Sequence, residues 1–463
     1  MSEIAKSSVP RVSLWMGAAR RALAVELTAR LSGGQTFTGA AGGAQAFALG
    51  IGGAEAGAWM REDDGGLHWA EPLGDDLRAA LAGAAPGVFF IADLGAFGTA
   101  ADPALRLADF DLLANCRTRG VRVATLEPLP ASLIELMETG PADAGAQGPI
   151  LLGSVGTLRR SEERGTLWST PLPCARMLRG VRAALDVRDS LGAVRAVSIE
   201  CLGRPEHGTL GTRLLDGLDL IHLFLGEPDT LEAHASAPAE PGVRATPGDT
   251  LRGLDGDISA LLRFGGGKSA TLFASCRAGA FAIRATVLGA HGSITVSDAE
   301  FAWRDASGKV LETFQSVAME PRLRREDAPR RLSAGSGGAG GAAGAATPSP
   351  AGAAAKKRQR TKKGSAAEPM LLSPESLSAA LGVAPPPPPV KAVESGERVD
   401  QRFAALLAEQ LRIAANESGG ATLIPTSGGA SGAMVLAMAQ AALLSCRTGE
   451  GESPATMLRI AGG

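Results

Sequence analysis

Two carboxylates, Asp216 and Asp219, lie three residues apart in a largely apolar stretch of the chain, Leu214–Pro228, which reads LLDGLDLIHLFLGEP. The spacing of its leucines predicts a helix over Leu214–Leu225, ended by the glycine and proline that follow. Asp216 and Asp219 would share one face of that helix. Such a pair can act as general acid and base when its pKa values differ. Alternatively, Asp216 is a charge at the helix start and Asp219 a buried hydrogen-bonding residue. We favour this second interpretation, because paired acids are only a statistical indicator of function.

A strongly basic run, KKRQRTKK at Lys356–Lys363, is the second feature that could do chemistry. Nuclear targeting and nucleic-acid binding are both compatible with such a run. It contains no aromatic residue on which a base could stack, so any nucleic-acid binding would be electrostatic. We favour a solubilising charge block, and nucleic acid is not an expected partner. The surrounding segment, 331–397, has Gly/Ala/Ser tracts and five consecutive prolines, which predicts a disordered insertion.

The elements that would position these residues begin with alternating strands and helices over 11–140. This alternation predicts an α/β domain with a parallel sheet. Its clearest strand is Val88–Asp93, a buried run that ends in an acid. Asp75 or Asp76 is expected to cap a helix that runs to about residue 84. Other elements are expected at Arg11–Met16, Ala18–Leu31, Thr36–Ala41, Leu67–Ala70, Pro103–Arg119, Val121–Thr125 and Pro130–Glu138.

Beyond residue 150 the pattern changes to consecutive strands, two of which are joined by the hairpin sequence GGGK. A helix followed by such strands predicts an antiparallel sheet with helices on one face. After the insertion, apolar helices over 403–411 and Met434–Cys446 are expected to pack back on the folded body. The second domain is therefore expected to consist of 150–330 and 398–460. Its strands are expected at Val194–Cys201, Asp257–Phe264, Ser269–Ser275, Ala282–Leu288 and Ser293–Val296.

Composition narrows the class of protein. A chain of 463 residues is long enough for two or three domains with their own cores. The formal net charge of −2 gives no indication of nucleic-acid binding. The five cysteines are scattered without a CxxC pair, which argues against disulfides and zinc and favours a cytoplasmic location. The N-terminus lacks a secretory signal, and the longest apolar run, Ala433–Leu444, is shorter than the roughly 20 residues that a membrane span needs.

The order of these elements resembles the glucose–fructose oxidoreductase and inositol dehydrogenase (Gfo/Idh/MocA) family. The resemblance extends over about 11–330 and 398–460. It implies a Rossmann-like N-terminal domain that binds NAD or NADP. It also implies an α+β C-terminal domain whose large, mostly antiparallel open sheet binds a carbohydrate-like substrate, and a homo-oligomer. The segments that carry it are LGAVRAVSIE at Leu191, LLDGLDLIHLFLGEPDTLEAHA at Leu214, DISALLRFGGGKSATLFAS at Asp257 and VLGAHGSITV at Val287.

The family's dinucleotide-binding turn, GxGxxG, corresponds here to GAARRA. Gly17 keeps the first glycine, whereas Ala19 and Ala22 replace the other two. A Cβ at position 19 would crowd the phosphates of a dinucleotide. The resemblance makes Gly17, Ala18, Ala19 and Arg20 the candidate cofactor-binding residues. Arg20 could contact phosphate, or it could be solvated, and we favour the latter because the helix dipole disfavours cations there.

Two further positions of the family differ in charge. The acid that ends the second strand and holds the ribose hydroxyls has no counterpart, since Ala41–Gly43 stand there. In the Glu-Lys-Pro signature, Glu127 replaces the lysine and Pro128 matches the proline. A carboxylate reverses the charge that would favour a developing alkoxide. Glu127 could act as a base, but we favour a capping or surface role, because acids are common at helix starts.

The family's DxGxHxxD motif aligns Asp219 with its final Asp and Asp216 with its acid/base His. Thr212 and Leu214 replace the first Asp and the Gly. A register with His222 as the catalytic His would move the Leu-Gly pair out of alignment, so we reject it. No ligand spacing surrounds His222, and a metal site is not expected.

Two functions remain open. In the first, the chain transfers hydride between NAD or NADP and a carbohydrate-like hydroxyl, with Asp216 or Glu127 as the base. In the second, it is a non-catalytic binding or assembly protein on the same fold and binds no cofactor. Four of the family's functional residues have no counterpart: the second glycine, the ribose acid, the lysine and the histidine. Their joint absence argues against activity, and the non-catalytic protein is kept as the alternative to the oxidoreductase.

Overall fold

A computed structural model describes the following residues: 11–32, 47–57, 60, 70–98, 103–138, 169–236, 250–315, 399–416 and 431–462. The expected strand Thr36–Ala41 lies outside this part of the chain. So do the expected insertion 331–397 and its basic run Lys356–Lys363.

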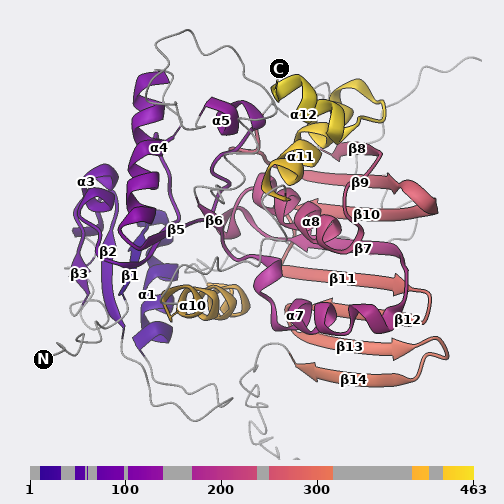
Figure 1. Ribbon diagram of the computed structural model, residues 1–463. Coiled ribbons are helices and arrows are strands. Elements are labelled where there is room, and N and C mark those ends of the chain that lie inside the picture. Colours follow the sequence, from indigo (N-terminus) through magenta and orange to yellow (C-terminus); the bar gives the residue numbers. More distant parts are fainter. Residues whose placement is uncertain are drawn as a thin grey trace, which may run out of the picture. The chain divides into compact units, whose positions relative to one another are not determined.

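The N-terminal domain is built on a six-stranded parallel sheet in the order β3-β2-β1-β4-β5-β6 (Figure 1). The chain leaves β1 in one direction for β2 and β3, and in the other for β4, β5 and β6. Ligands of such sheets bind at the carboxyl ends of the strands where the direction reverses. The expected α/β domain is confirmed. Its strands are β1 Arg11–Trp15, β2 Ala48–Gly52, β3 Glu71–Pro72, β4 Gly87–Ile91, β5 Val121–Thr125 and β6 Thr170–Pro171.

The expected position of the second strand was wrong. The strand beside β1 is β2, Ala48–Gly52, so Ala41–Gly43 are not its carboxyl end. Glycines interrupt its apolar run, which weakens the period-2 signal that a strand usually gives. They are required by packing: a Cβ on Gly50 or on Gly52 would lie 2.8 Å from the side chain of Leu73. The two residues that follow β2, Gly53 and Ala54, are not acids, and the nearest acid, Glu55, comes three residues after the strand.

Helices cover the first sheet, and the N-terminus of α3 shows which of the two predicted aspartates caps that helix. The side chain of Asp76 accepts hydrogen bonds from the backbone N–H groups of Arg78 and Ala79, so Asp76 is the cap of α3. The helices are α1 Arg21–Ser32, preceded by the 3-10 turn Ala18–Arg20, α3 Leu77–Ala82, α4 Pro103–Thr118 and α5 Leu133–Glu138.

The cap gives a simple stability prediction. Asp76→Ala is expected to lower the free energy of unfolding by about 1 kcal/mol, because two N–H groups of the first turn lose their acceptor. Urea denaturation measures the loss. Asp75→Ala, one residue earlier and outside the cap, is the matched control. An equal loss in both variants would contradict the assignment.

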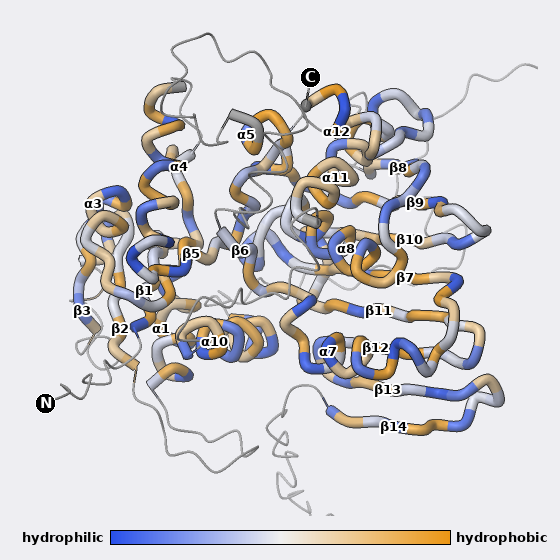
Figure 2. Tube along the Cα trace, viewed as in Figure 1, coloured by the Kyte–Doolittle hydropathy of each residue, from blue (hydrophilic) through white to orange (hydrophobic). Residues whose placement is uncertain are grey.

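The C-terminal domain is built on an eight-stranded sheet in the order β14-β13-β12-β11-β7-β10-β9-β8. The expected mostly antiparallel sheet is confirmed; one pair, β7 with β10, is parallel. Hydrophobic and hydrophilic residues alternate along these strands (Figure 2), as in a sheet with one covered face. The strands are β7 Val194–Leu202, β8 Thr230–Ser236, β9 Asp257–Phe264, β10 Lys268–Ser275, β11 Ala282–Gly289, β12 Gly292–Ser297, β13 Glu300–Asp305 and β14 Val310–Gln315.

Three helices cover one face of the second sheet: α7 lies on β12 and β13, α8 on β7 and β10, and α11 on β8. The helix that carries the carboxylate pair, α8, begins at Leu210, four residues earlier than expected. Its first turn lies against backbone, since a Cβ on Gly211 would be 1.9 Å from the carbonyl oxygen of Leu251. The helices are α7 Arg179–Asp186, α8 Leu210–Leu225, α11 Ser431–Thr448 and α12 Pro454–Gly462.

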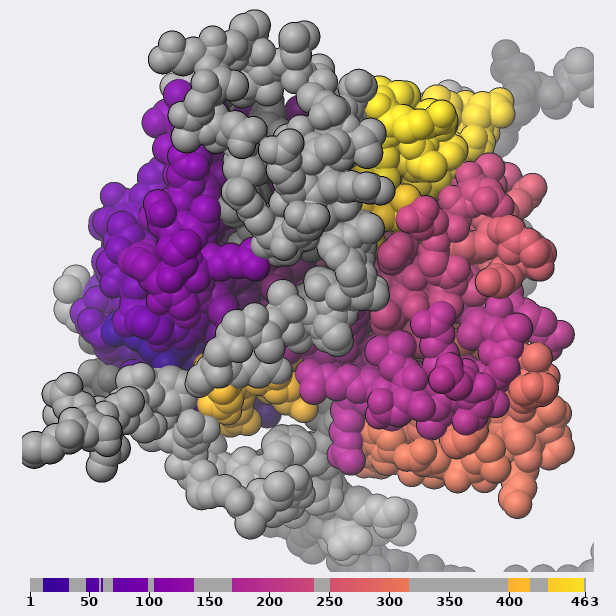
Figure 3. All heavy atoms as spheres, in the orientation of Figure 1, coloured from indigo at the N-terminus to yellow at the C-terminus, as the bar shows by residue number. Residues whose placement is uncertain are grey.

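The remaining helix, α10 (Gln401–Asn416), returns to the first sheet. It packs on α1, β1 and β4 (Figure 1). Its side chains, amber in Figure 3, lie beside the indigo and purple atoms of the N-terminal residues. Gln410 fixes its position, because the side chain accepts from the N–H of Cys174 at 2.7 Å and donates to the carbonyl of Cys174 at 2.9 Å. No helix among the described residues is long and apolar enough to cross a bilayer.

Candidate functional site

Three strand ends meet at one edge of the first sheet, and two of them are followed by sequence-predicted residues. Gly17 follows β1 by two residues, and Glu127 follows β5 by two residues. Between these strands lies β4, and Asp93 follows it by the same two residues. The last residues of the three strands are in register, so the three positions are neighbours. This is the edge at which open parallel sheets bind their ligands.

A carboxylate of the chain itself occupies the turn after β1. The N–H of Gly17 donates to Oδ2 of Asp93 at 2.7 Å, and Nε of Arg20 donates to Oδ1 of Asp93 at 2.9 Å. In a dinucleotide-binding fold the pyrophosphate lies against this turn and the N-terminus of the helix that follows it. Arg20 also donates to the backbone carbonyl of Glu206 in the second domain. The carboxylate of Asp93 therefore stands where a bound anion would accept the same hydrogen bonds.

The four candidate cofactor residues thus have different environments. Ala18 and Ala19 are exposed, and Gly17 is half-buried. Arg20 is not the solvated arginine that the sequence favoured, because its side chain is 16% exposed and is paired with an acid. Asp93 was not predicted as a site residue. The signal was present, since it is the acid that ends the clearest strand of the domain.

Glu127 is half-buried beside the same charges. Burial raises the pKa of Glu127; Arg252 and Arg20 oppose this rise, and Asp93 adds to it. Arg252 comes from a loop of the second domain. It donates to the carbonyl of Gly98 at 3.0 Å, and its buried Nε has no hydrogen-bond partner among the described residues. We call Arg20, Asp93, Glu127 and Arg252 the strand-end cluster; it holds two acids and two arginines.

Asp216 lies inside the protein. It is 7% exposed, and its Oδ1 accepts from the N–H of Ala175 at 2.7 Å. Its Oδ2 is buried without a hydrogen-bond partner among the described residues. Burial raises the pKa of Asp216 to about 7, although Arg213 and the Ala175 N–H act in the opposite direction. Near neutral pH the carboxyl group is therefore divided between its protonated and ionised forms.

The other polar side chains of α8 also point inward. Asp219 pairs with the buried guanidinium of Arg176. Burial raises the pKa of Asp219, and Arg176 opposes this rise. Arg213 is fully buried: one nitrogen donates to the carbonyl of His207 at 2.8 Å, and its Nε and Nη1 have no described partner. Its guanidinium lies 5.0 Å from the ring centre of Phe281.

The structure thus places the three sequence-predicted catalytic residues in two groups. Glu127 belongs to the strand-end cluster, whereas Asp216 and Asp219 lie with Arg176 and Arg213. No contact among the described residues joins Glu127 to either aspartate. The two groups are nevertheless linked through backbone, because the hydroxyl of Thr212 in α8 donates to the carbonyl of Leu126 at 2.7 Å.

The part of the chain that the structure describes contains no group of His, Cys, Asp and Glu side chains that could hold a metal ion. The five cysteines are unpaired, and four of them are buried. Burial lowers the pKa of His222, whose Nδ1 is enclosed without a described partner.

Comparisons with known proteins extend this description. The sequence matches no protein-family model and no curated protein. Among solved structures, an oxidoreductase from Agrobacterium radiobacter, in complex with NAD+, L-tartaric acid and magnesium, is similar over 97% of this chain and 100% of its own. The identity is 14% and the TM-score 0.50. A levoglucosan dehydrogenase in complex with NADH and levoglucosan covers 96% of this chain and 99% of its own, at 13% identity and a TM-score of 0.49.

A scyllo-inositol dehydrogenase from Lactobacillus casei gives 11% identity and a TM-score of 0.47, covering 96% of this chain and 98% of its own. At such identities, similarity concerns the fold. The chain has the two-domain fold of the Agrobacterium oxidoreductase, and the resemblance seen in the sequence is confirmed at that level. Fold alone does not decide activity.

Proposed function

We propose that this chain is a binding or assembly protein on a dehydrogenase fold, and that it does not transfer hydride. The observation that carries the proposal is the carboxylate of Asp93 on the N–H of Gly17. That hydrogen bond holds a carboxylate at the turn against which a pyrophosphate would bind. A dinucleotide would have to displace a group that is covalently part of the protein and already in place.

Charge adds to this competition. A phosphate near the turn would approach the carboxylate of Asp93. A second negative charge about 4 Å from a carboxylate near a protein surface costs about 4 kcal/mol, which is a factor of about 10³ in affinity. Arg20 offsets part of this repulsion, but its Nε is already engaged by the carboxylate of Asp93.

The groups of the chemical step are also out of place. Hydride removal from an alcohol develops an alkoxide, which a nearby cation would stabilise. The corresponding position at the end of β5 holds the acid Glu127. Asp216, the other candidate base, has both oxygens inside the protein, one on the Ala175 N–H and one enclosed. A general base must reach the proton that it removes.

A second candidate function rests on Glu127. Burial raises the pKa of this carboxyl group, which brings it closer to the range of a general base at neutral pH. In that case the chain would bind NAD or NADP and remove a proton from a carbohydrate-like hydroxyl. It would also require Asp93 to release Gly17 when the cofactor binds.

Titration with NADH and NADPH, followed by nicotinamide fluorescence, distinguishes the two functions. We expect no saturable binding to the wild-type protein. Saturable binding at micromolar cofactor would overturn the proposal, provided that Gly17→Trp abolishes it. The variants Asp93→Ser and Asp93→Glu test whether the charge of Asp93 prevents cofactor binding. Only the serine variant, which loses the charge, is expected to gain measurable affinity for NADH or NADPH. A homo-oligomer, implied by the resemblance, remains a prediction that sedimentation would test.

A further inference from the structure

Helix α8 buries two opposite charges one turn apart, Arg213 and Asp216. Arg213 is fully buried, and Asp216 is 7% exposed. Their spacing of three residues places both side chains on the same face of the helix. Burial raises the pKa of Asp216 and Arg213 opposes this rise, whereas burial lowers the pKa of Arg213 and Asp216 opposes this fall. The two charges therefore lie close enough to interact inside the second domain.

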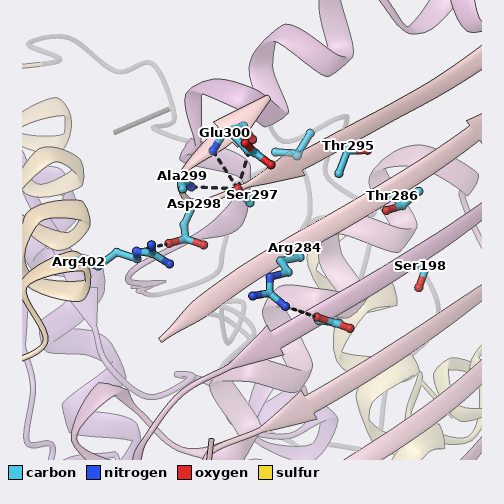
Figure 4. A pocket seen from close by; sticks show the side chains of 11 residues that line it. Ser198, Arg284, Thr286, Thr295, Ser297, Asp298, Ala299, Glu300 and Arg402 are labelled. Atoms are coloured by element: carbon cyan, nitrogen blue, oxygen red, sulfur yellow. Dashed lines mark hydrogen bonds and ion pairs between the residues drawn. The ribbon is translucent and has the colours of Figure 1, made fainter. Parts of the chain in front are cut away.

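Neighbouring charges elsewhere in this domain form direct ion pairs. In the hollow shown in Figure 4, which strands of the second sheet line, Nη1 of Arg284 lies 3.2 Å from Oε2 of Glu200. Arg213 and Asp216 form no such pair. Nε and Nη1 of the arginine and Oδ2 of the aspartate are buried, and none of the three atoms has a hydrogen-bond partner among the described residues. A gap thus separates two groups that attract one another.

The side chains around this gap are poor partners for its charges. Burial raises the pKa of Cys201 well above its usual value; Asp216 adds to this rise, and Arg213 opposes it. The thiol is therefore protonated, and a neutral thiol is a weak donor and a weak acceptor. Phe281 presents its ring to the guanidinium of Arg213 with 5.0 Å to the ring centre. Leaving buried donors and acceptors unpaired would cost their full desolvation.

Space remains beside one of the unpaired atoms because residue 203 is a glycine. Gly203 is buried and directly follows β7. A Cβ added to it would lie 3.6 Å from Nε of Arg213 and 3.5 Å from Cβ of His207. A methyl group would fit there in ordinary van der Waals contact, and a single water molecule needs about the same room.

The chemistry of the three atoms selects the ligand. Nε and Nη1 of Arg213 are donors on a cation, and Oδ2 of Asp216 is an acceptor when the carboxyl group is ionised. An anion would accept from Arg213 but would be repelled by the carboxylate, and a cation would be repelled by the guanidinium. Water both accepts and donates, and buried waters make about three hydrogen bonds to groups that are otherwise unpaired. Water is therefore the ligand that suits both residues.

We propose that at least one ordered water molecule is bound between Arg213 and Asp216, where it accepts from the guanidinium group and donates to Oδ2. It joins the two side chains into a water-mediated ion pair. When Asp216 is protonated, the same water accepts from the carboxyl O–H and remains bound. The site shares no residue with the strand-end cluster, and it does not depend on whether the chain binds a dinucleotide.

A crystal structure of the full chain, from crystals grown in sodium bromide, tests the proposal directly. We expect an electron-density peak within about 3.2 Å of Oδ2 of Asp216 and of Nε or Nη1 of Arg213. This peak should give no anomalous signal at the bromine edge. A peak with that signal would identify a bound anion, and a direct contact between the two side chains would leave no room for a ligand. Either result, or the absence of any peak between the side chains, overturns the proposal.

Urea unfolding of two glycine variants gives a second test. Gly203→Ala fills the space beside Nε of Arg213 and displaces the water. It is expected to lower the ratio of folded to unfolded protein by about tenfold, as when one buried donor loses its partner.

Gly83→Ala is the matched control. Its φ of −89° suits alanine, and its Cβ would meet only a carbonyl oxygen at 3.5 Å. This variant is expected to be neutral or slightly stabilising, because alanine restricts the unfolded chain. Equal behaviour of the two variants would overturn the proposal, since the methyl group at position 203 would then have displaced nothing.

Discussion

Replacing Asp216 by asparagine is expected to stabilise the protein most above pH 7 and clearly less at pH 5. Burial raises the pKa of Asp216 from 3.8 to about 7. Between these values the folded state holds a proton that the unfolded state has lost, so stability is present at low pH and is lost as pH rises through 7. At pH 8 the ionised group costs about 4 kcal/mol. Asparagine keeps the acceptor for the Ala175 N–H without the charge.

Urea unfolding at pH 5 and pH 8 checks this expectation. The neighbouring substitution Asp219→Asn is the contrast, because it removes a carboxylate that pairs with the buried Arg176 guanidinium. It should lower stability at pH 8 by about 3 kcal/mol, since the buried cation loses this charged partner. If Asp216→Asn stabilises and Asp219→Asn destabilises the protein at pH 8, the result would support the different environments of the two carboxylates. The same effect of Asp216→Asn at both pH values would contradict the raised pKa.

Phe403→Ala is expected to lower the free energy of unfolding by about 3 to 5 kcal/mol, because it leaves a cavity in the core. Phe403 is 1% exposed. Its ring stacks on His207 with 4.4 Å between centres and meets Phe281 edge-on at 5.2 Å. It also lies in the first turn of α10, whose N–H groups are capped by Asp400. Its loss therefore loosens both the aromatic cluster and the docking of α10.

The same variant should change a titration. Burial lowers the pKa of His207 from 6.5 to about 4, so its contribution to stability is present above pH 6.5 and is lost as pH falls toward 4. In Phe403→Ala the imidazole ring of His207 becomes accessible to water, and its pKa should return toward 6.5. NMR titration of the histidine measures it, and Phe403→Leu, which keeps most of the volume, should leave it low. An unchanged pKa in the alanine variant would show that Phe403 is not the group that shields His207.

Elements with strong local signals were predictable. The bounds of β5 and β9 agree with the expected strands, because each is an apolar or alternating run that ends at a polar residue or a glycine. The strand β2 was missed because glycines, which its packing against Leu73 requires, remove the local signal. The start of α8 was missed because Gly211 and Thr212 interrupt the apolar periodicity of the helix.

The residues of the candidate site also divide into those that the sequence could predict and those that it could not. The placement of Gly17 and Glu127 at one sheet edge follows from strand order alone, and sequence could supply it. The role of Asp93 depends on β4 lying beside β1, which is a long-range pairing. Arg252 comes from a loop that is even farther away in the sequence, although it lies near Glu127 in the structure. The shared helix face of Asp216 and Asp219 was predictable. The backbone N–H that bonds to the buried Asp216 comes from Ala175, and no local sequence pattern indicates this contact.

The position of α10 has a consequence for how the protein is made. The strands β1 and β4 and the helix α1 leave the ribosome early, whereas the helix that packs on them ends at Asn416. At synthesis rates of roughly 5–20 residues per second, the apolar surface under α10 waits uncovered for tens of seconds. The first domain to be synthesised is thus completed only when most of the second domain has already been made. Any chain that stops short of α10 would carry an open hydrophobic surface permanently, and chaperone binding or aggregation would be its expected fate.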